Sequence, residues 1–371
     1  MANGNTKKPA LLRQGWLFVG SGGRIRTSDL RVMSPTSCLC STPHRVKSSE
    51  NKKFRPEIGC KGNNFVSLQS KKPRKNFTMS HKAGYVNIIG RPNVGKSTLM
   101  NQLVGEKISI ITSKAQTTRH RILGIVNGDD FQIVFSDTPG IIKDPAYKMH
   151  EVMNQFVNVA LIDADLILFV VDITDKKIEE KTVERLKTTD IPVFVLINKI
   201  DLSTQEQVEQ AVMQWRETLP NATVFPLSAQ YNANVEFIFK QILEKLPECP
   251  PYFPKDELTD RSMRFFITEI IREKILLNYQ QEIPYSVQVE VESYEETQKH
   301  IHIRSIIYVA RDSQKAIIIG KGGSAIKKLG MQARTDIEEF TGKKIFLELF
   351  VKVDKDWRDN EAELKRFGYE A

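Results

Sequence analysis

The sequence predicts two domains in series, an α/β domain with a mostly parallel sheet and helices on both faces and then a smaller α+β domain. Three observations support this order. Apolar strands alternate with helical patterns between residues 85 and 245. A proline-rich segment at 247–254 then interrupts every period and is expected to be a semi-rigid linker. Beyond it, the order of the expected elements changes.

The first expected strand, residues 85–89, leads into the segment GRPNVGKS at 90–97 and then into a helical pattern. Glycines let such a loop fold back, so that backbone N–H groups and the helix N-terminus surround one anion. We expect Lys96 to lie along the β- and γ-phosphates and Ser97 to place its hydroxyl on Mg²⁺. The alternative, an ordinary glycine turn, does not account for the flanking strand and helix.

A second apolar strand, residues 132–135, ends in Asp137-Thr138-Pro139-Gly140. The carboxylate of Asp137 can reach the metal through water, and the N–H of Gly140 can meet a γ-phosphate. Such a tetrapeptide alone is more often a turn. The functional interpretation of this tetrapeptide is stronger here because it follows an apolar strand, and the carboxyl ends of parallel strands form one ligand-binding edge of the sheet.

Two later strands supply a base pocket. Asp201 follows the strand at 193–197 and can accept hydrogen bonds from guanine N1–H and the exocyclic amine. Adenine has no such donor pair, so this carboxylate favours guanine. Ser228 and Ala229 follow the strand at 223–227 and would offer a backbone N–H to the guanine carbonyl.

The polar segment 113–121 lies between the phosphate loop and Asp137 and has no clear period. It occupies the place of a mobile nucleotide-sensing loop. We expect Thr118, in preference to Thr117, to complete the Mg²⁺ shell when a γ-phosphate is present. The alternative is a solvated basic connection.

From Gly84 to Tyr369 the chain resembles the Era family, Ras-like bacterial GTPases of the TrmE-Era-EngA-YihA group with a C-terminal type II KH domain. The phosphate loop, the segment QTTRHR at 116–121 and the two later nucleotide motifs carry the resemblance. It implies a P-loop GTPase domain at 79–247, a linker at 248–258 and an α+β KH domain at 259–371. It also implies slow, Mg²⁺-dependent hydrolysis of GTP to GDP and phosphate.

The elements after the linker fit a type II KH domain: a helix at 260–277, strands at 286–291 and 300–309, two short helices around Gly320, and a strand at 345–353. A Gly-x-x-Gly turn between helices lets a single-stranded backbone approach the main chain, while neighbouring apolar residues receive bases. Residues 311–334 hold six basic side chains and one acidic one, which is the charge pattern of an RNA site. A helix–turn–helix corner with solvated lysines is the alternative.

The resemblance also guides the expected site residues. Ile141 stands where Ras-like enzymes have a water-orienting glutamine, so unaided hydrolysis should be slow. Related GTPases with Pro-Asn in the loop hold K⁺ through that asparagine, which makes Asn93 a candidate for the same role. The predicted catalytic residues are Lys96, Asn93, Asp137 and Gly140.

Three further sets complete the expected sites. The nucleotide-binding set is Gly90, Arg91, Pro92, Asn93, Val94, Gly95, Lys96, Ser97, Thr98, Asp137, Thr138, Pro139, Gly140, Ile141, Asn198, Lys199, Asp201, Ser228 and Ala229. The metal ligands are Ser97 and Thr118. The RNA-binding set is Lys315, Ile319, Gly320, Lys321, Gly322, Gly323, Ile326, Lys327 and Lys328.

Charge is unevenly distributed. The chain of 371 residues has a formal net charge of +9, but residues 1–78 hold 16 Lys and Arg against 3 Asp and Glu. The remainder holds 38 basic and 42 acidic residues, so RNA binding must be argued locally. The N-terminal segment shows no sustained period, and we expect no fold there. We interpret it as a gene-model error with translation starting at Met79; a basic RNA-binding tail is the alternative.

No run approaches the roughly 20 apolar residues of a membrane-spanning helix. Cys249 is the only cysteine after residue 78, which fits a reducing cytoplasm. The resemblance implies binding to the 3′ end of small-subunit (16S) ribosomal RNA on the immature subunit, and peripheral association with the inner face of the cell membrane. Nothing demands more than a monomer.

Two other functions compete with this interpretation. One is a non-hydrolysing RNA-binding assembly factor with a structural nucleotide pocket, against which the complete set of Lys96, Ser97 and Asp137 argues. The other is a tRNA-modifying GTPase, whose catalytic cysteine near the C-terminus is absent from this sequence.

Overall fold

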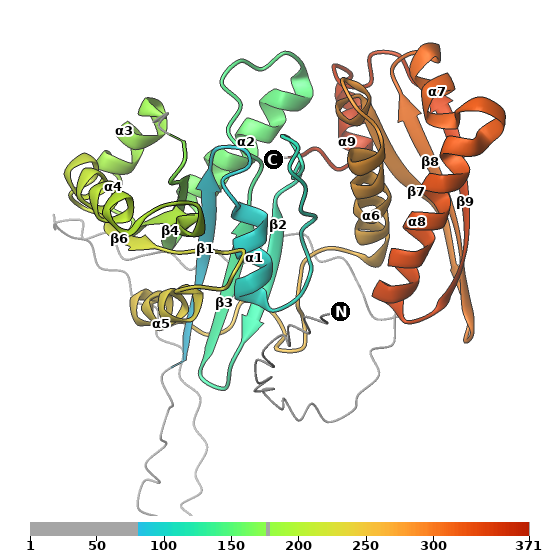
Figure 1. Cartoon of the computed structure of the whole chain (residues 1–371). Helices are drawn as coiled ribbons and strands as arrows, with labels where there is room; N and C mark the ends of the chain where they lie inside the picture. Colours follow the sequence, from blue (N-terminus) through green and yellow to red (C-terminus); the bar gives the residue numbers. More distant parts are fainter. Residues whose placement is uncertain (1–80, 176–178, 371) are drawn as a thin grey trace, which may run out of the picture. The chain divides into compact units, whose positions relative to one another are not determined.

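The computed structural model describes residues 81–175 and 179–370, which Figure 1 colours along the chain. The expectations about residues 1–78, including a start at Met79, lie outside the described residues. Within the described ranges, no helix combines the length and apolar character needed to cross a membrane.

Six strands form the first sheet. In sheet order they are β2 (Ile122–Asn127), β3 (Phe131–Asp137), β1 (Lys82–Gly90), β4 (Leu166–Asp172), β5 (Val193–Asn198) and β6 (Thr223–Pro226). All neighbours pair in parallel except β2 and β3, which are antiparallel. The expected mostly parallel sheet is confirmed. The edge strand β2 is an addition to the predicted elements, and a tight turn, with Gly128 N–H donating to the Phe131 carbonyl (3.0 Å), joins it to β3.

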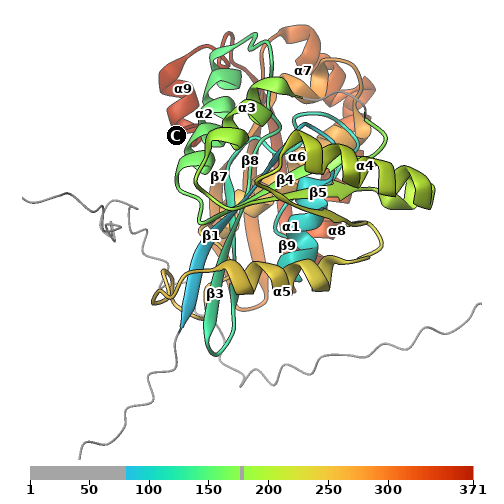
Figure 2. The same ribbon diagram turned by 90° about the vertical axis from the view of Figure 1, so that its left-hand side faces the viewer.

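Five helices cover this sheet on both sides (Figures 1 and 2). One face carries α1 (Lys96–Val104) and α5 (Val235–Lys245), and the other carries α2 (Lys148–Ile162), α3 (Glu180–Thr188) and α4 (Gln205–Thr218). A short 3₁₀ turn, η1 (Ile200–Leu202), follows β5.

Strand residues divide between the two cores by alternation. Leu168 and Leu196 pack with α1 and α5, whereas Phe169 and Val195 pack with α3 and α4. Successive side chains of a strand point to opposite faces. A sheet buried on both faces therefore needs unbroken apolar strands, which is the pattern in the sequence.

The linker lies against the first sheet. The Gln132 side chain on β3 accepts hydrogen bonds from the N–H groups of Tyr252 (2.6 Å) and Phe253 (2.9 Å) and donates to the Phe253 carbonyl (2.8 Å). The Tyr85 and Tyr252 rings also lie 5.0 Å apart. These contacts hold the proline-rich segment in one path along the sheet.

The second domain has the predicted order of helix, two strands, two helices and strand, with two 3₁₀ turns and a C-terminal helix in addition. The elements are α6 (Met263–Asn278), η2 (Ile283–Tyr285), β7 (Val287–Glu296), β8 (His300–Val309), α7 (Asp312–Ile319), η3 (Lys321–Gly323), α8 (Ser324–Thr341), β9 (Lys344–Val353) and α9 (Glu361–Arg366). In the sheet, β8 pairs antiparallel with β7 and parallel with β9. The helices α6 and α8 pack on one face through residues such as Ile271, Ile303 and Ile337. The α+β arrangement expected of a type II KH domain is confirmed.

Two expected features of this domain are wrong. The helix expected from Asp260 begins at Met263, because Ser262 is its N-cap and its hydroxyl accepts from the Phe265 N–H at 3.4 Å. The second of the two helices that flank Gly320 is not short: α8 has 18 residues, and Gly342 caps its C-terminus in a left-handed conformation.

The C-terminal segment is part of the folded structure. Trp357 and Tyr369 are buried, and they share a cluster with Ile306 and Tyr308 on the outer face of the second sheet. Met149, Met153 and Phe156 of α2 belong to the same cluster. Residues 354–370 therefore connect the second sheet to a helix of the first domain.

Candidate functional site

The phosphate loop joins β1 to α1 and depends on two glycines. Gly90 has φ +150°, and a Cβ there would lie 2.3 Å from the Val170 carbonyl oxygen. Gly95 has φ +98°, and a Cβ there would lie 2.2 Å from Nδ2 of Asn198. Only glycine fits these two close approaches, so the loop can press against β4 and the segment after β5.

Lys96 lies inside the loop. Its Nζ donates to the carbonyls of Gly90 (3.1 Å) and Arg91 (2.9 Å). The side chain is buried, and burial lowers the pKa of Lys96 to about 8, although the nearby Asp137 carboxylate favours the charged form. The two carbonyls hold the ammonium group in one position, and they do not cancel its positive charge. The group can therefore bind an anion.

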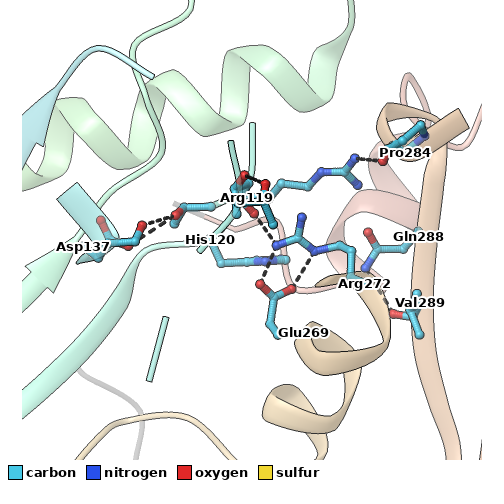
Figure 3. Close-up of polar contacts among 12 residues, drawn as sticks. Arg119, His120, Asp137, Glu269, Arg272, Pro284, Gln288 and Val289 are labelled. Atoms are coloured by element: carbon cyan, nitrogen blue, oxygen red, sulfur yellow. Dashed lines mark hydrogen bonds and ion pairs between the residues drawn. The ribbon is translucent and has the colours of Figure 1, made fainter. Parts of the chain in front are cut away.

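Three oxygen-bearing side chains meet beside Lys96. Ser97 Oγ lies 2.7 Å from Asp137 Oδ2 and 2.9 Å from Thr118 Oγ1, and Thr118 Oγ1 lies 3.2 Å from the same carboxylate oxygen. Asp137 is fully buried, which raises its pKa against the influence of Lys96. Figure 3 shows Asp137 at the end of β3, with dashed lines marking its contacts.

The chemistry of this cluster fits a hard divalent cation. The other carboxylate oxygen, Asp137 Oδ1, is buried and has no hydrogen-bond partner among the described residues. Hydroxyl and carboxylate oxygens are the ligands that Mg²⁺ prefers. Thr117 is directed elsewhere, because its hydroxyl contacts Thr112 Oγ1 and the Lys114 carbonyl at 2.7 Å each. The geometry therefore favours Thr118 over Thr117 as the residue beside the cluster.

The segment after Asp137 approaches the phosphate loop. The Thr138 hydroxyl donates to the Ile88 carbonyl at 2.8 Å. A Cβ on Gly140 would lie 2.7 Å from the backbone nitrogen of Pro92. Gly140 thus lies directly against the phosphate loop, and Ile141 packs at the edge of the core around α3 and α4.

The base motifs meet at the ends of β5 and β6. Asn198 donates to the Val94 carbonyl (2.8 Å) and accepts from the Ala229 N–H (2.9 Å), so it joins the phosphate loop to the segment after β6. Asp201 is exposed, and its Oδ1 lies 2.5 Å from the Ser228 hydroxyl. Lys199 pairs with Asp172 at 2.6 Å.

The segment 113–121 contacts both domains. Asn93 of the phosphate loop donates to the Ser113 carbonyl at 2.9 Å. At the other end, Arg119 is buried and donates to the carbonyls of Val287, Pro284 and Tyr285 in the second domain (2.7, 3.0 and 3.2 Å). Figure 3 shows the Arg119 side chain extending from the first domain toward Pro284.

Residues of the second domain that no motif indicated also reach this segment. Arg272 on α6 donates to the Thr117 carbonyl and pairs with Glu269, and both side chains are buried (Figure 3). From the sequence alone, Glu269 and Arg272 would be interpreted as an ordinary i,i+3 ion pair on a helix surface. The sequence gives little signal for their burial, because the same helix also carries Arg264, Glu273 and Lys274.

The Gly-x-x-Gly turn lies between α7 and α8. Gly320 has φ +72°, and a Cβ there would lie 2.6 Å from the Cβ of Ala325, so the turn requires glycine. Lys321, Lys327 and Lys328 are exposed. The apolar side chains at the turn, Ile319 and Ile326, are partly buried at the edge of the core. The structure therefore brings the predicted RNA-binding residues together around one exposed turn, and Lys315 precedes it on α7.

The chain is similar to known proteins over both domains. Residues 85–199 match the family model described as a 50S ribosome-binding GTPase, and residues 282–358 match that of a KH domain. GTPase Era of Alkaliphilus metalliredigens (strain QYMF) is 46% identical over 297 residues, which cover 79% of this chain and 100% of that protein. A chloroplastic ERA-like GTPase of Oryza sativa subsp. japonica is 46% identical over 297 residues, covering 78% of this chain and 70% of that protein.

Two solved structures have the same two-domain fold. One is Era in complex with MgGDPNP and nucleotides 1506–1542 of 16S ribosomal RNA, with a TM-score of 0.75 and 38% identity over 78% of this chain and 100% of that one. The other is a variant of Aquifex aeolicus Era bound to GDP and AlF₄⁻, with a TM-score of 0.75 and 39% identity over 78% and 100%. Since a relative is matched over its whole length at 46% identity, the chain belongs to the Era family of GTPases.

Proposed function

We propose that this Era-family protein binds GTP and GDP with Mg²⁺ and hydrolyses GTP slowly. We also propose that it binds small-subunit ribosomal RNA through its KH domain during assembly of the small subunit. One observation carries the proposal: Lys96, Ser97, Thr118 and Asp137 converge at the end of β1 and β3, in a chain that also presents an exposed Gly-x-x-Gly turn.

The proposed nucleotide site is the predicted set around the phosphate loop. Backbone N–H groups of 90–98 and the α1 N-terminus surround the phosphates, and Lys96 neutralises their charge. Ser97 and Thr118 are the proposed Mg²⁺ ligands, with Asp137 acting through water. When bound, the ion offsets negative charge on the phosphate oxygens. Gly140 is the proposed N–H donor to the γ-phosphate, which is supported by its close approach to the loop: a Cβ there would lie 2.7 Å from the Pro92 nitrogen.

The proposed base site uses Asp201 as the guanine-selective acceptor. Its exposure leaves the carboxylate open to a ligand, and the Ser228 hydroxyl orients it from one side. Asn198 acts by holding the phosphate loop and the Ala229 segment at a fixed distance. Lys199 and Asp172 support the same corner of the site.

The proposed RNA site is the Gly-x-x-Gly turn with its flanking residues. The turn lets an RNA backbone approach the main chain, Lys321 contacts phosphate, and Ile319 and Ile326 receive bases. By analogy with the Era structure that contains nucleotides 1506–1542 of 16S ribosomal RNA, the ligand is the 3′ end of this RNA.

A single-turnover assay tests the enzymatic half of the proposal. With excess protein and Mg²⁺, we expect GTP to be converted to GDP on the order of once per hour, the scale of Ras-like enzymes without an activating partner. Lys96→Ala should abolish the conversion. Binding of GTP without any conversion would support the alternative, a non-hydrolysing RNA-binding assembly factor with a structural nucleotide pocket.

Asn93 is proposed to hold K⁺ beside the transferred phosphate, which predicts salt-specific turnover. We expect hydrolysis at least about fivefold faster in K⁺ than in Na⁺, or about 1 kcal/mol of transition-state stabilisation. Asn93→Ala should remove the difference. Since Asn93 has φ 64°, Asn93→Gly is a second variant that loses the side chain without backbone strain. Equal wild-type rates in the two salts would exclude this role.

The remaining parts of the proposal concern organisation and location. We place the domain boundaries at 79–247 and 259–371, with 248–258 between them, in agreement with the Gln132 contacts that hold this linker. The protein is proposed to be a cytoplasmic monomer that associates peripherally with the inner face of the membrane. Resemblance to the family is the support for this location.

A further inference from the structure

The four successive residues of the segment 117–120 contact different parts of the structure. Only Thr118 turns its side chain to Ser97 and Asp137. Its neighbours on both sides are bound by the KH domain: the Thr117 carbonyl by Arg272, and Arg119 by three carbonyls of η2 and β7. The position of the Thr118 hydroxyl therefore depends on contacts from a different domain.

The Arg272 contact is built for orientation. Arg272 Nε lies 2.8 Å from Glu269 Oε1, and a second guanidinium nitrogen pairs with Glu269 Oε2 and also donates to the Thr117 carbonyl. Arg272 is 1% exposed and Glu269 4%. A forked pair of this kind fixes the plane of the guanidinium group, so it fixes the carbonyl that the group holds.

His120 receives a third set of contacts from the end of the chain. Its Nε2 lies 3.2 Å from the Phe367 carbonyl oxygen, and its ring centre lies 4.4 Å from that of Tyr369. The Tyr369 hydroxyl donates to Gln288 Oε1 at 3.1 Å. Burial lowers the pKa of His120 to about 3, which keeps its ring neutral at physiological pH.

Stability alone does not explain this network. A buried Arg–Glu pair often gives no more stability than apolar residues of similar size, because desolvation offsets the attraction. The hydrogen-bonding capacity of the two arginines is also only partly used, since Arg272 Nη1 and Arg119 Nε are buried without a hydrogen-bond partner in the described part of the chain. What the pair adds beyond stability is a fixed geometry, and this points to a role in positioning.

We infer that Glu269 and Arg272 of the KH domain are positioning residues for the nucleotide site of the GTPase domain. By holding the Thr117 carbonyl, they keep the Thr118 hydroxyl beside Ser97 and Asp137, where it meets Mg²⁺ in the GTP-bound protein. This inference rests on the proposed GTPase function. It follows that side chains of the KH domain partly set the Mg²⁺-dependent preference of the GTPase domain for GTP over GDP.

The test replaces the pair without leaving a buried charge. In the double variant Glu269→Leu/Arg272→Met both partners become apolar, which preserves folding better than removal of one partner. We expect the affinity for a non-hydrolysable GTP analogue in Mg²⁺ to fall about tenfold, the effect of one lost charge-assisted hydrogen bond. Affinity for GDP, and for either nucleotide in EDTA, should change less than about twofold. The single variant Arg272→Lys keeps the charge and the Glu269 partner, so its affinity for the GTP analogue should fall less than that of the double variant.

The control is Arg264→Met, which changes an exposed arginine on the same helix and should bind like wild type. Equal weakening of GTP and GDP, with or without Mg²⁺, would show that the pair only supports the fold and would overturn the inference. Wild-type affinity in the double variant, with an unchanged melting temperature, would also overturn it. Failure of the wild-type protein to bind the analogue at all would instead refute the proposed GTPase function.

Discussion

Replacing Asp201 by asparagine is expected to change the nucleotide that the protein prefers. The carboxylate is the proposed acceptor for guanine N1–H and the exocyclic amine, whereas an amide nitrogen would present a donor to the same edge. Leaving these polar groups mismatched should weaken GTP at least about a hundredfold. Xanthosine triphosphate carries a carbonyl oxygen where guanine carries the amine, so its affinity should rise. Calorimetric titration of both nucleotides measures the switch.

The structure indicates that this substitution leaves the fold intact. Asp201 is exposed in η1, and an asparagine Oδ1 can keep the contact with the Ser228 hydroxyl. Asp190→Asn, at an exposed position before β5, removes the same charge away from the site and serves as the matched control. Unchanged GTP affinity in the Asp201 variant would mean that the base lies elsewhere.

Replacing Gly322 by aspartate is expected to weaken RNA binding by at least about tenfold. The substitution places a carboxylate where the RNA phosphates approach, and repulsion between like charges opposes binding. Gly322 has φ +58°, a conformation that Asp and Asn tolerate better than other residues, and a Cβ there meets no atom within 4 Å. The domain should therefore remain folded. Fluorescence anisotropy with a 3′-end small-subunit RNA oligonucleotide measures the effect.

Gly322→Asn separates charge from shape in this experiment. It has nearly the same size and backbone tolerance but no charge, so its affinity should lie much closer to wild type. The gap between the two variants should shrink as salt is raised, because salt screens the carboxylate. Equal losses in both variants would indicate a steric effect, and no loss in either would remove the turn from the RNA-binding surface.

Much of the site follows from short-range rules in the sequence. The phosphate loop needs glycines at Gly90 and Gly95 where the backbone turns back on β4 and Asn198, and their spacing is visible without a structure. The apolar strands place Asp137 and Asp201 at one edge of the sheet because parallel strands share a direction. The Gly-x-x-Gly turn is equally local, since it depends on the positive φ angles of Gly320 and Gly322.

The edges of elements were harder to predict because their signals are weak or distant. Strand β2 is held by pairing with β3 and by contacts to the linker, such as Ile125 N–H to the Leu258 carbonyl at 2.8 Å. The helix boundary at Met263 depends on the Ser262 cap and not on the apolar pattern. Tyr369 reads as part of a polar tail, yet it is buried against His120.

The sequence by itself therefore indicated the two-domain organisation, the phosphate loop, the carboxylate proposed to select guanine and the turn proposed to bind RNA, because each rests on residues close together in the chain. Tertiary structure alone decided how the domains meet. Arg119 and Arg272 find their partners 168 and 155 residues away, in Val287 and Thr117. Those partners are backbone carbonyls, which every residue type carries, so no pattern of side chains could have identified them.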